Sequence, residues 1–315
     1  MLKKQPNKRW MSLWRHFYDR EKTAEQLTES MIQWQAKWNW DLLKLNPAAC
    51  YHVLDWGAEY HFYDDPLKEP TLVQPVINNV DDFQRIGHLD VNQGTLGDQL
   101  KVIRKLRAHF GPDLPIVETV FSPPEIAHRL MTGREAFTDF MHRDPERVHG
   151  LLKIIADVFE QFCLACLDAG ASGIFFATKW ANSDSMTREE YQRFERPYDL
   201  QILNRLEARK ALIVLHVCGP NTYLGDMLDD PSDLISYDFF VKGNPDPSEL
   251  LASSGKFVMG GIDPQRLKTN LDSVVADCKR FVKFDRWMAG PSCVVLPDTP
   301  DSAVQELKNR LWSLH

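Results

Sequence analysis

From residue 114 onward, the apolar positions of the chain follow two alternating spacings, which predict strands joined by helices. Short continuous apolar runs alternate with longer segments in which apolar residues recur every three or four positions. The runs predict buried strands at residues 114–121, 172–178, 211–218, 233–240, 256–263 and 286–296. Because helix-like segments separate these strands, we expect the strands to pair in parallel.

The first third of the chain has a helical pattern with two weaker strand signals. Residues 10–46 place apolar residues three and four positions apart, and Asn46-Pro47 ends that pattern. Residues 49–56 predict a short strand. Two later segments again carry helical spacing, residues 81–89 and 95–111.

Together these elements predict one α/β architecture. It is a single (β/α)8 TIM barrel over residues 47–315, with residues 1–46 as an added N-terminal helical segment. About seven strands are clear, and an eighth could lie near residues 71–78. No glycine-rich phosphate loop follows any predicted strand, which argues against a dinucleotide-binding sheet. In a TIM barrel the active site lies where the strands end, so residues just after the strands are the functional candidates.

Composition narrows the class of protein. The chain has 315 residues, 43% of them hydrophobic and 26% charged, with a net charge of −7. No apolar run approaches the roughly 20 residues of a membrane span, and the basic N-terminus lacks the apolar core of a secretory signal. The net acidity argues against a nucleic-acid partner. Six cysteines spread along such a chain predict a reduced, cytoplasmic protein.

The strand predicted at residues 211–218 ends in a His-x-Cys pair. Residues i and i+2 of a strand point to the same side, so His216 and Cys218 face one way at the mouth of the predicted barrel. Cys293 follows the last predicted strand, and strand ends converge on the same opening. One imidazole and two thiolates make a three-ligand zinc set with a fourth position open. A packed core feature is the alternative interpretation of the pair alone, and Cys293 favours the metal site.

The other four cysteines predict structural roles. Cys163 and Cys166 lie in the middle of an apolar helix with no strand before them, which favours core packing over a redox site. Cys278 lies on a predicted helix among charged residues, and Cys50 opens a predicted strand.

Several segments of the chain resemble the uroporphyrinogen decarboxylase superfamily. They are IVETVFSPPEIAHRLMTG, YDLQIL followed by LIVLHVCG, FVMGGIDPQRL and CVVLPDTPDSAVQELKNRL. The resemblance rests on motif order and spacing and covers roughly residues 40–312. It implies a TIM barrel and one of two activities. One branch removes acetate carboxyl groups from a porphyrinogen without a cofactor; the other contains zinc enzymes that move a methyl group from a corrinoid protein to a thiol such as coenzyme M.

The chain is more similar to the methyltransferase branch. That branch carries His-x-Cys on a strand and a distant cysteine after the last strand, which match His216, Cys218 and Cys293. The decarboxylase branch carries a Met-Arg-Gln-Ala-Gly-Arg run and a late Gly-His-Gly segment, and neither occurs here. Few cationic side chains are evident for the carboxylates of a porphyrinogen. The resemblance implies Zn²⁺, a corrinoid methyl donor that is free or on a partner protein, and a small-molecule thiol acceptor. A homodimer is a further expectation, taken from the decarboxylase branch.

Carboxylates near strand ends are secondary catalytic candidates. Glu118 could complete the zinc shell in the resting state, and Asp238 or Asp263 could orient His216 from outside that shell. Helix caps or salt bridges at the barrel rim would explain these three residues equally well. The residues predicted to face the substrate are Asp55, Glu59, Trp180, Asn182 and Asp184. However, the two segments that contain them, VLDWGAEYHFYDDP and FATKWANSDSMTREEY, match no known substrate loop.

The predicted metal ligands, together with what the resemblance implies, predict a zinc-dependent methyltransferase. A zinc-bound thiolate would attack an electrophilic methyl carbon, and a cobalt(I) corrinoid or another good leaving group would depart. Two other functions stay open at this point. One is a metal-free lyase that acts on a tetrapyrrole or another polycarboxylate, and the other is a non-catalytic protein that binds a corrinoid or tetrapyrrole.

Overall fold

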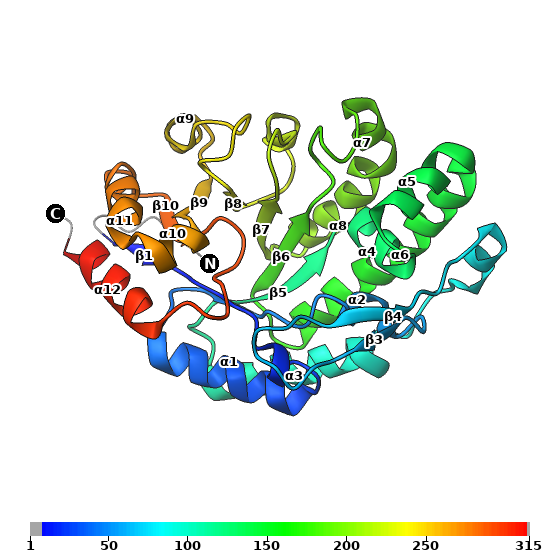
Figure 1. Ribbon diagram of the computed structural model, residues 1–315, viewed down its shortest axis with the longest axis horizontal. Coiled ribbons are helices and arrows are strands. Elements are labelled where there is room, and N and C mark those ends of the chain that lie inside the picture. The colour runs from blue at the N-terminus through cyan, green and yellow to red at the C-terminus, as the bar shows by residue number, and fades with distance from the viewer. Residues whose placement is uncertain (1–7, 314–315) are drawn as a thin grey trace.

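A curled sheet of eight parallel strands forms the centre of the protein, as seen in a computed structural model that describes residues 8–313 (Figure 1). Each strand pairs in parallel with its neighbours. In spatial order the strands are β1 (Trp10–Met11), β10 (Trp287–Pro291), β9 (Phe257–Ile262), β8 (Leu234–Tyr237), β7 (Leu212–Val217), β6 (Gly173–Thr178), β5 (Ile116–Phe121) and β2 (Leu43–Lys44).

Hydrogen bonds join the two edges of this sheet. The Ser12 hydroxyl, just after β1, donates to the Leu42 carbonyl at 2.6 Å. The Asp41 amide donates to the Met11 carbonyl at 3.2 Å. These contacts bring β1 and β2 together, so the arrangement is a TIM-barrel-like α/β fold.

Helices surround the sheet (Figure 1). The longer ones are α1 (Ala24–Trp38), α3 (Gly94–Phe110), α5 (Arg134–Arg143), α6 (Pro145–Asp168), α8 (Arg196–Ala208), α11 (Leu271–Lys279) and α12 (Asp301–Trp312). The shorter ones are α2 (Tyr51–Leu54), α4 (Pro123–Ala127), α7 (Arg188–Phe194), α9 (Pro247–Ser253) and α10 (Pro264–Thr269). Four 3₁₀ turns complete the set, namely η1 (Tyr18–Arg20), η2 (Val80–Arg85), η3 (His128–Leu130) and η4 (Leu224–Met227). Within residues 8–313, no helix combines the length and apolarity that a membrane crossing requires.

The six strands predicted from residue 114 onward are confirmed as β5 to β10, and their parallel pairing is confirmed as well. The long helices between them follow the expected pattern. In α6, the buried residues recur at spacings of three and four, and Asp144 caps the helix by accepting from the Arg147 amide. Two predicted helices are each divided in two, at Glu195 between α7 and α8 and at Asn270 between α10 and α11.

The prediction of an added helical segment before residue 47 is wrong for the part of it that the structure describes. Only α1 and the turn η1 are helical there, and β1 and β2 are strands of the sheet itself. Strands of two residues are too short to produce an alternating pattern, so the helical spacing of α1 dominated the whole segment. The first seven residues of the predicted segment lie outside the described range.

The strand predicted at residues 49–56 is also wrong, since α2 lies there. The run near residues 71–78 does contain a strand, β4 (Thr71–Gln74), but β4 is not part of the barrel. It pairs antiparallel with β3 (Glu59–His61) in a separate hairpin. The two strands that complete the sheet are therefore β1 and β2.

Candidate functional site

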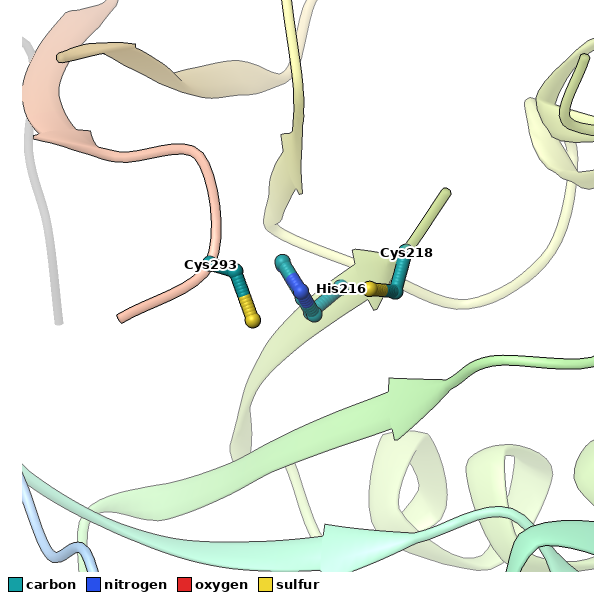
Figure 2. A group of neighbouring side chains, drawn as sticks. All are labelled: His216, Cys218 and Cys293. Atoms are coloured by element: carbon teal, nitrogen blue, oxygen red, sulfur yellow. The ribbon is translucent and has the colours of Figure 1, made fainter. Parts of the chain in front are cut away.

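The three predicted metal ligands converge at one end of the sheet (Figure 2). His216 lies in β7, Cys218 is the first residue after that strand, and Cys293 follows β10 by two residues. One ligand atom from each residue lies within 4.8 Å of the other two. The side chains of residues 75 positions apart in the sequence thus meet at strand ends, as the fold predicts.

Ser236 fixes the orientation of the His216 ring. In the parallel register of β7 and β8, His216 and Ser236 are partners. The Ser236 hydroxyl and His216 Nδ1 are hydrogen-bonded at 3.0 Å, and both residues are buried. The Phe175 ring stacks on the imidazole with centroids 5.3 Å apart. Because Nδ1 is engaged, Nε2 is the atom left for a metal.

The pKa values of the two thiols of the cluster shift in opposite directions. The hydrogen bond from Cys218 lowers the pKa of Cys293 well below the usual value for a thiol, and it outweighs the opposing effect of burial. A second hydrogen bond and the charge of His216 act in the same direction. The same bond to Cys293, together with burial, raises the pKa of Cys218. A cation bound between the sulfurs would favour the thiolate form of both residues.

This donor set fits zinc. Zinc prefers nitrogen and sulfur ligands at about 2.0–2.3 Å in tetrahedral geometry, which places neighbouring ligand atoms a little under 4 Å apart. The three atoms lie within 4.8 Å of one another, so a small inward movement of the side chains would bring them to that spacing. Three protein ligands leave the fourth corner of the tetrahedron for a substrate.

A cavity of about 370 Å³ opens beside His216 and Cys293. Aromatic and apolar side chains form much of its wall, including Trp14, Tyr51, Phe121 and Phe175. Three cationic side chains also line it, from Lys44, Arg129 and Lys179. The expectation that few cations would lie at the mouth is therefore corrected.

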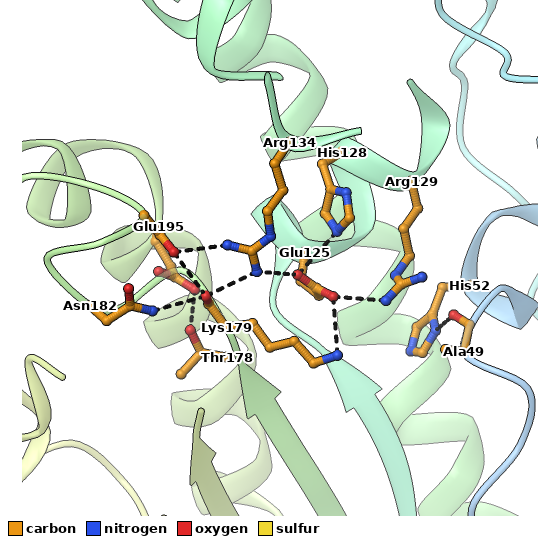
Figure 3. A network of polar contacts seen from close by, with 11 residues as sticks. Ala49, His52, Glu125, His128, Arg129, Arg134, Thr178, Lys179, Asn182 and Glu195 are labelled. Atoms are coloured by element: carbon orange, nitrogen blue, oxygen red, sulfur yellow. Dashed lines mark hydrogen bonds and ion pairs between the residues drawn. The ribbon is translucent and has the colours of Figure 1, made fainter. Parts of the chain in front are cut away.

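Two of these cations belong to an ionic network around the buried carboxylate of Glu125 (Figure 3). Arg129 and Lys179 approach that carboxylate at 2.9 and 3.5 Å. Arg134 and His128 lie at 3.3 and 3.1 Å. Burial alone would raise the pKa of Glu125, but the hydrogen bond from His128 and the neighbouring charges hold it well below its ordinary value. Glu125 is thus a stable anion with several cationic partners.

Glu118 lies deeper in the barrel than the metal ligands. In sheet register it is level with Ile174 and Ile213, whereas His216 lies three residues further along β7. One oxygen accepts from the Thr119 amide at 3.0 Å, and the other has no hydrogen-bond partner within the described residues. Burial raises the pKa of Glu118 well above its ordinary value. Its carboxyl group is outside the three-ligand cluster, and its predicted catalytic role stays a prediction.

Neither Asp238 nor Asp263 orients His216, because Ser236 occupies that position. Asp238 accepts from the Phe240 amide at 3.0 Å in the turn after β8. Asp263 caps α10 by accepting from the amides of residues 265 and 266. Both carboxylates therefore have local backbone roles.

The two carboxylates predicted to face substrate near the hairpin are outside the cavity wall. Asp55 accepts from the amides of Thr95 and Leu96 at 2.7 and 2.9 Å and so caps the start of α3. Glu59 is exposed at the start of β3. Substrate binding by either residue stays a prediction.

The loop after β6 contacts the backbone of Cys218 through a hydrogen bond from Asn182. The Asn182 amide donates to the Lys179 carbonyl at 3.0 Å and to the Cys218 carbonyl at 3.5 Å. Asp184 accepts from Asn221 at 3.4 Å. Trp180 is 1% exposed and packs against Phe137, with ring centroids 5.0 Å apart. None of the three predicted substrate contacts in this loop lines the cavity.

The structure also shows where the other four cysteines and Lys44 lie. Cys163, Cys166 and Cys278 are buried, in agreement with their predicted structural roles. Cys50 does not open a strand; it precedes α2 and lines the cavity. In the sequence, the one feature that distinguishes Lys44 is its position as a lone cationic residue within the apolar run LLKL.

The comparisons with known proteins agree with this geometry. A family model described as "Uroporphyrinogen decarboxylase (URO-D)" matches residues 6–311. The chain belongs to the uroporphyrinogen decarboxylase family. The members of this family are enzymes, and the chain can be compared with its named relatives.

The relatives include both activities of this family. "Methylcobamide:CoM methyltransferase MtbA" of Methanosarcina acetivorans is 24% identical over 249 residues, which is 77% of this chain and 71% of that protein. A "Uroporphyrinogen decarboxylase" of Rhodococcus opacus is 26% identical over 233 residues, 70% of this chain and 64% of that protein. Among solved structures, a "methyltransferase from Methanosarcina mazei" has a TM-score of 0.82 at 18% identity and covers 96% of this chain and 93% of its own. This structural similarity shows that the two chains share a fold.

Proposed function

We propose that this protein is a zinc-dependent methyltransferase that moves a methyl group from a methyl-corrinoid to a small-molecule thiol. The observation that carries the proposal is the convergence of His216, Cys218 and Cys293 within 4.8 Å at the barrel mouth. The similarity to methylcobamide:CoM methyltransferases supports the choice of donor and acceptor.

Each residue of the cluster has a defined role in this proposal. His216 would bind zinc through Nε2, because Ser236 engages Nδ1. Cys218 and Cys293 would bind it as thiolates, and their negative charges balance that of the ion. Zinc, when bound, lowers the pKa of an acceptor thiol at the open position and holds it as a thiolate at neutral pH.

The transfer itself requires placement more than acid–base chemistry. A bond forms between the acceptor sulfur and the methyl carbon, while the carbon–cobalt bond breaks and its electron pair stays on cobalt. The walls of the cavity hold the acceptor in line with the methyl group and exclude water from it. A corrinoid is too large for this cavity, so the donor approaches from the mouth, either free or on a partner protein.

The size of the cavity argues against a porphyrinogen as substrate. Its volume of about 370 Å³ lies at the small end of the range of roughly 300–1,000 Å³ for ligand pockets. A short-chain thiol fits this space. A lyase acting on a small polycarboxylate is the second candidate, and the observation that favours it is the presence of Lys44, Arg129 and Lys179 in the wall.

A single-turnover assay tests the proposal. Purified zinc-loaded protein is mixed with methylcobalamin and 2-mercaptoethanesulfonate, and the cobalt spectrum and the methyl thioether are followed together. We expect one thioether for each cobalt centre demethylated, with no product in Cys293→Ser. Release of carbon dioxide from a polycarboxylate by metal-free protein, without methyl transfer to any thiol, would favour the lyase instead.

A further inference from the structure

Lys44 is a buried lysine in the wall of the cavity beside the metal ligands, and burial lowers the pKa of its amine to about 7. It ends β2, is 4% exposed, and lines the same cavity as His216 and Cys293. Burying an ammonium group is costly unless a carboxylate or several hydrogen bonds replace its water. Within residues 8–313, Lys44 forms no salt bridge, and its hydrogen-bond acceptor is Asn46 Oδ1 at 2.5 Å.

The acidic groups that face Lys44 are Cys293, Glu118 and Glu21, and Cys293 would direct its charge to the metal. Burial raises the pKa of Glu118 well above its ordinary value, which disfavours the charged form of this carboxyl. Glu21 is bound elsewhere, since His16 Nδ1 lies 3.0 Å from its carboxylate and the Phe17 amide donates to it. Within residues 8–313, Lys44 therefore faces the cavity without an ion-pair partner, and an anion bound beside it would favour its ammonium form.

Asn46 adds a second donor at the same place. Its side-chain nitrogen is buried and has no acceptor within the part of the chain that the structure describes. Asn46 also lines the cavity, two residues after Lys44. The side chains of Lys44 and Asn46 thus place N–H groups that lack acceptors beside each other. Such an arrangement of donors is suited to binding an anion.

The Phe175 ring connects Lys44 with the metal ligands. Lys44 Nζ lies over the Phe175 ring, 4.6 Å from its centroid. The same ring stacks on His216 with centroids 5.3 Å apart. Lys44 and His216 thus contact the same ring and line the same cavity.

We propose that Lys44 and Asn46 form a subsite for an anionic group, a carboxylate or sulfonate, at the far end of the thiol acceptor. This inference rests on the proposed function and assigns the acceptor's charge to particular residues. Arg129 and Lys179 are less suited to the task, because both already pair with Glu125. An anion at Lys44 supplies the partner that the buried ammonium lacks.

Thiol binding to the zinc-loaded protein tests this subsite. Titration calorimetry compares two anionic thiols, 3-mercaptopropionate and 2-mercaptoethanesulfonate, with neutral 2-mercaptoethanol and cationic cysteamine. We expect both anionic thiols to bind more tightly than the neutral one, and cysteamine to bind most weakly.

Lys44→Met keeps the unbranched stem against Phe175 and removes the charge. It should weaken the anionic thiols about 10- to 100-fold, as expected for a charged hydrogen bond, and leave 2-mercaptoethanol nearly unchanged. A larger loss for one anionic thiol identifies which anion the subsite prefers.

Two further variants complete the design. Asn46→Asp places a carboxylate beside Lys44, so it should selectively weaken the anionic thiols even where Lys44→Met fails to fold. Lys179→Met is the control variant, because it removes a cation of the same cavity that pairs with Glu125. Equal binding of charged and neutral thiols, or a selective loss in Lys179→Met rather than in Lys44→Met, would overturn the subsite while leaving the proposed function intact. Failure of every thiol to bind the zinc-loaded protein would overturn both.

Discussion

Ser236 and His216 are register partners in adjacent parallel strands, and the Ser236 hydroxyl holds His216 Nδ1 at 3.0 Å. This contact fixes which imidazole nitrogen faces the two thiols. Groups that orient a metal-binding histidine tune both the direction of its lone pair and its basicity.

Replacing Ser236 with alanine should therefore weaken zinc binding. We expect affinity to fall by about 10- to 100-fold, the usual effect of losing such a partner. Competition with a chromogenic chelator measures it, and Ser236→Thr, which keeps the hydroxyl, is the matched control. Unchanged affinity in Ser236→Ala would mean that packing against Phe175 alone orients the ring.

Asn182 should act on zinc through Cys218. Its amide links the Lys179 and Cys218 carbonyls, so Asn182→Ala frees the loop that carries Cys218. We expect weaker zinc binding together with a stability loss of about 1–3 kcal/mol for the unpaired carbonyls. A chelator competition and a denaturant titration on the same sample separate the two effects. A loss of thiol affinity with zinc affinity unchanged would instead support the substrate contact predicted from sequence.

Trp180 should contribute to stability rather than to substrate binding. It is 1% exposed and packs against Phe137, outside the cavity wall. Trp180→Ala should cost about 3–5 kcal/mol, as for other large core truncations, whereas Trp180→Phe should cost less. Denaturant unfolding gives the cost. If Trp180→Phe is as stable as wild type but binds thiols weakly, then Trp180 contacts the substrate after all.

Glu195 should make the protein less stable as pH rises. This carboxyl is fully buried, and burial raises its pKa to about 7, although Thr178 donates a hydrogen bond to it. The folded form then keeps a proton that the unfolded chain, with a pKa of about 4.3, releases. Its contribution to stability is present below about pH 4.3 and is lost as pH rises towards 7.

Thermal unfolding at pH 5, 6 and 8 measures this effect. Glu195→Gln keeps an oxygen to accept from Thr178 but cannot ionise, so its melting temperature should fall less across this range than that of wild type. Asp199, whose pKa burial also raises, accounts for part of the remaining slope. The same slope in wild type and variant would contradict the assignment to Glu195.

The sequence pattern predicted the parts of the site that depend on strand ends. In a parallel barrel every strand ends at the same opening, so His216, Cys218 and Cys293 could be brought together without knowing any side-chain contact. The same reasoning recovered β5 to β10, because each is a buried run of four or more residues. For these six strands, the apolar pattern of the sequence agrees with the observed sheet.

What the pattern missed depends on register and on very short strands. Ser236 is recognisable as the partner of His216 only when the alignment of β7 with β8 is known. Lys44 lies in β2, a two-residue strand within a segment that read as helix, so its neighbours could not be inferred. Asp263 follows β9 and Asp55 follows α2, and each caps a helix, a role that a carboxylate serves as readily as substrate binding.

The central claim is that His216, Cys218 and Cys293 hold one zinc ion, and metal content tests it most directly. Elemental analysis compares wild type with His216→Ala, Cys293→Ser and Cys163→Ala, all purified under reducing conditions without chelator. The last variant removes a buried thiol far from the cluster in sequence and on α6. We predict about one zinc per chain in wild type and in Cys163→Ala, and loss of zinc in the other two variants. Wild-type protein without zinc, or full zinc retained in both His216→Ala and Cys293→Ser, would contradict the claim.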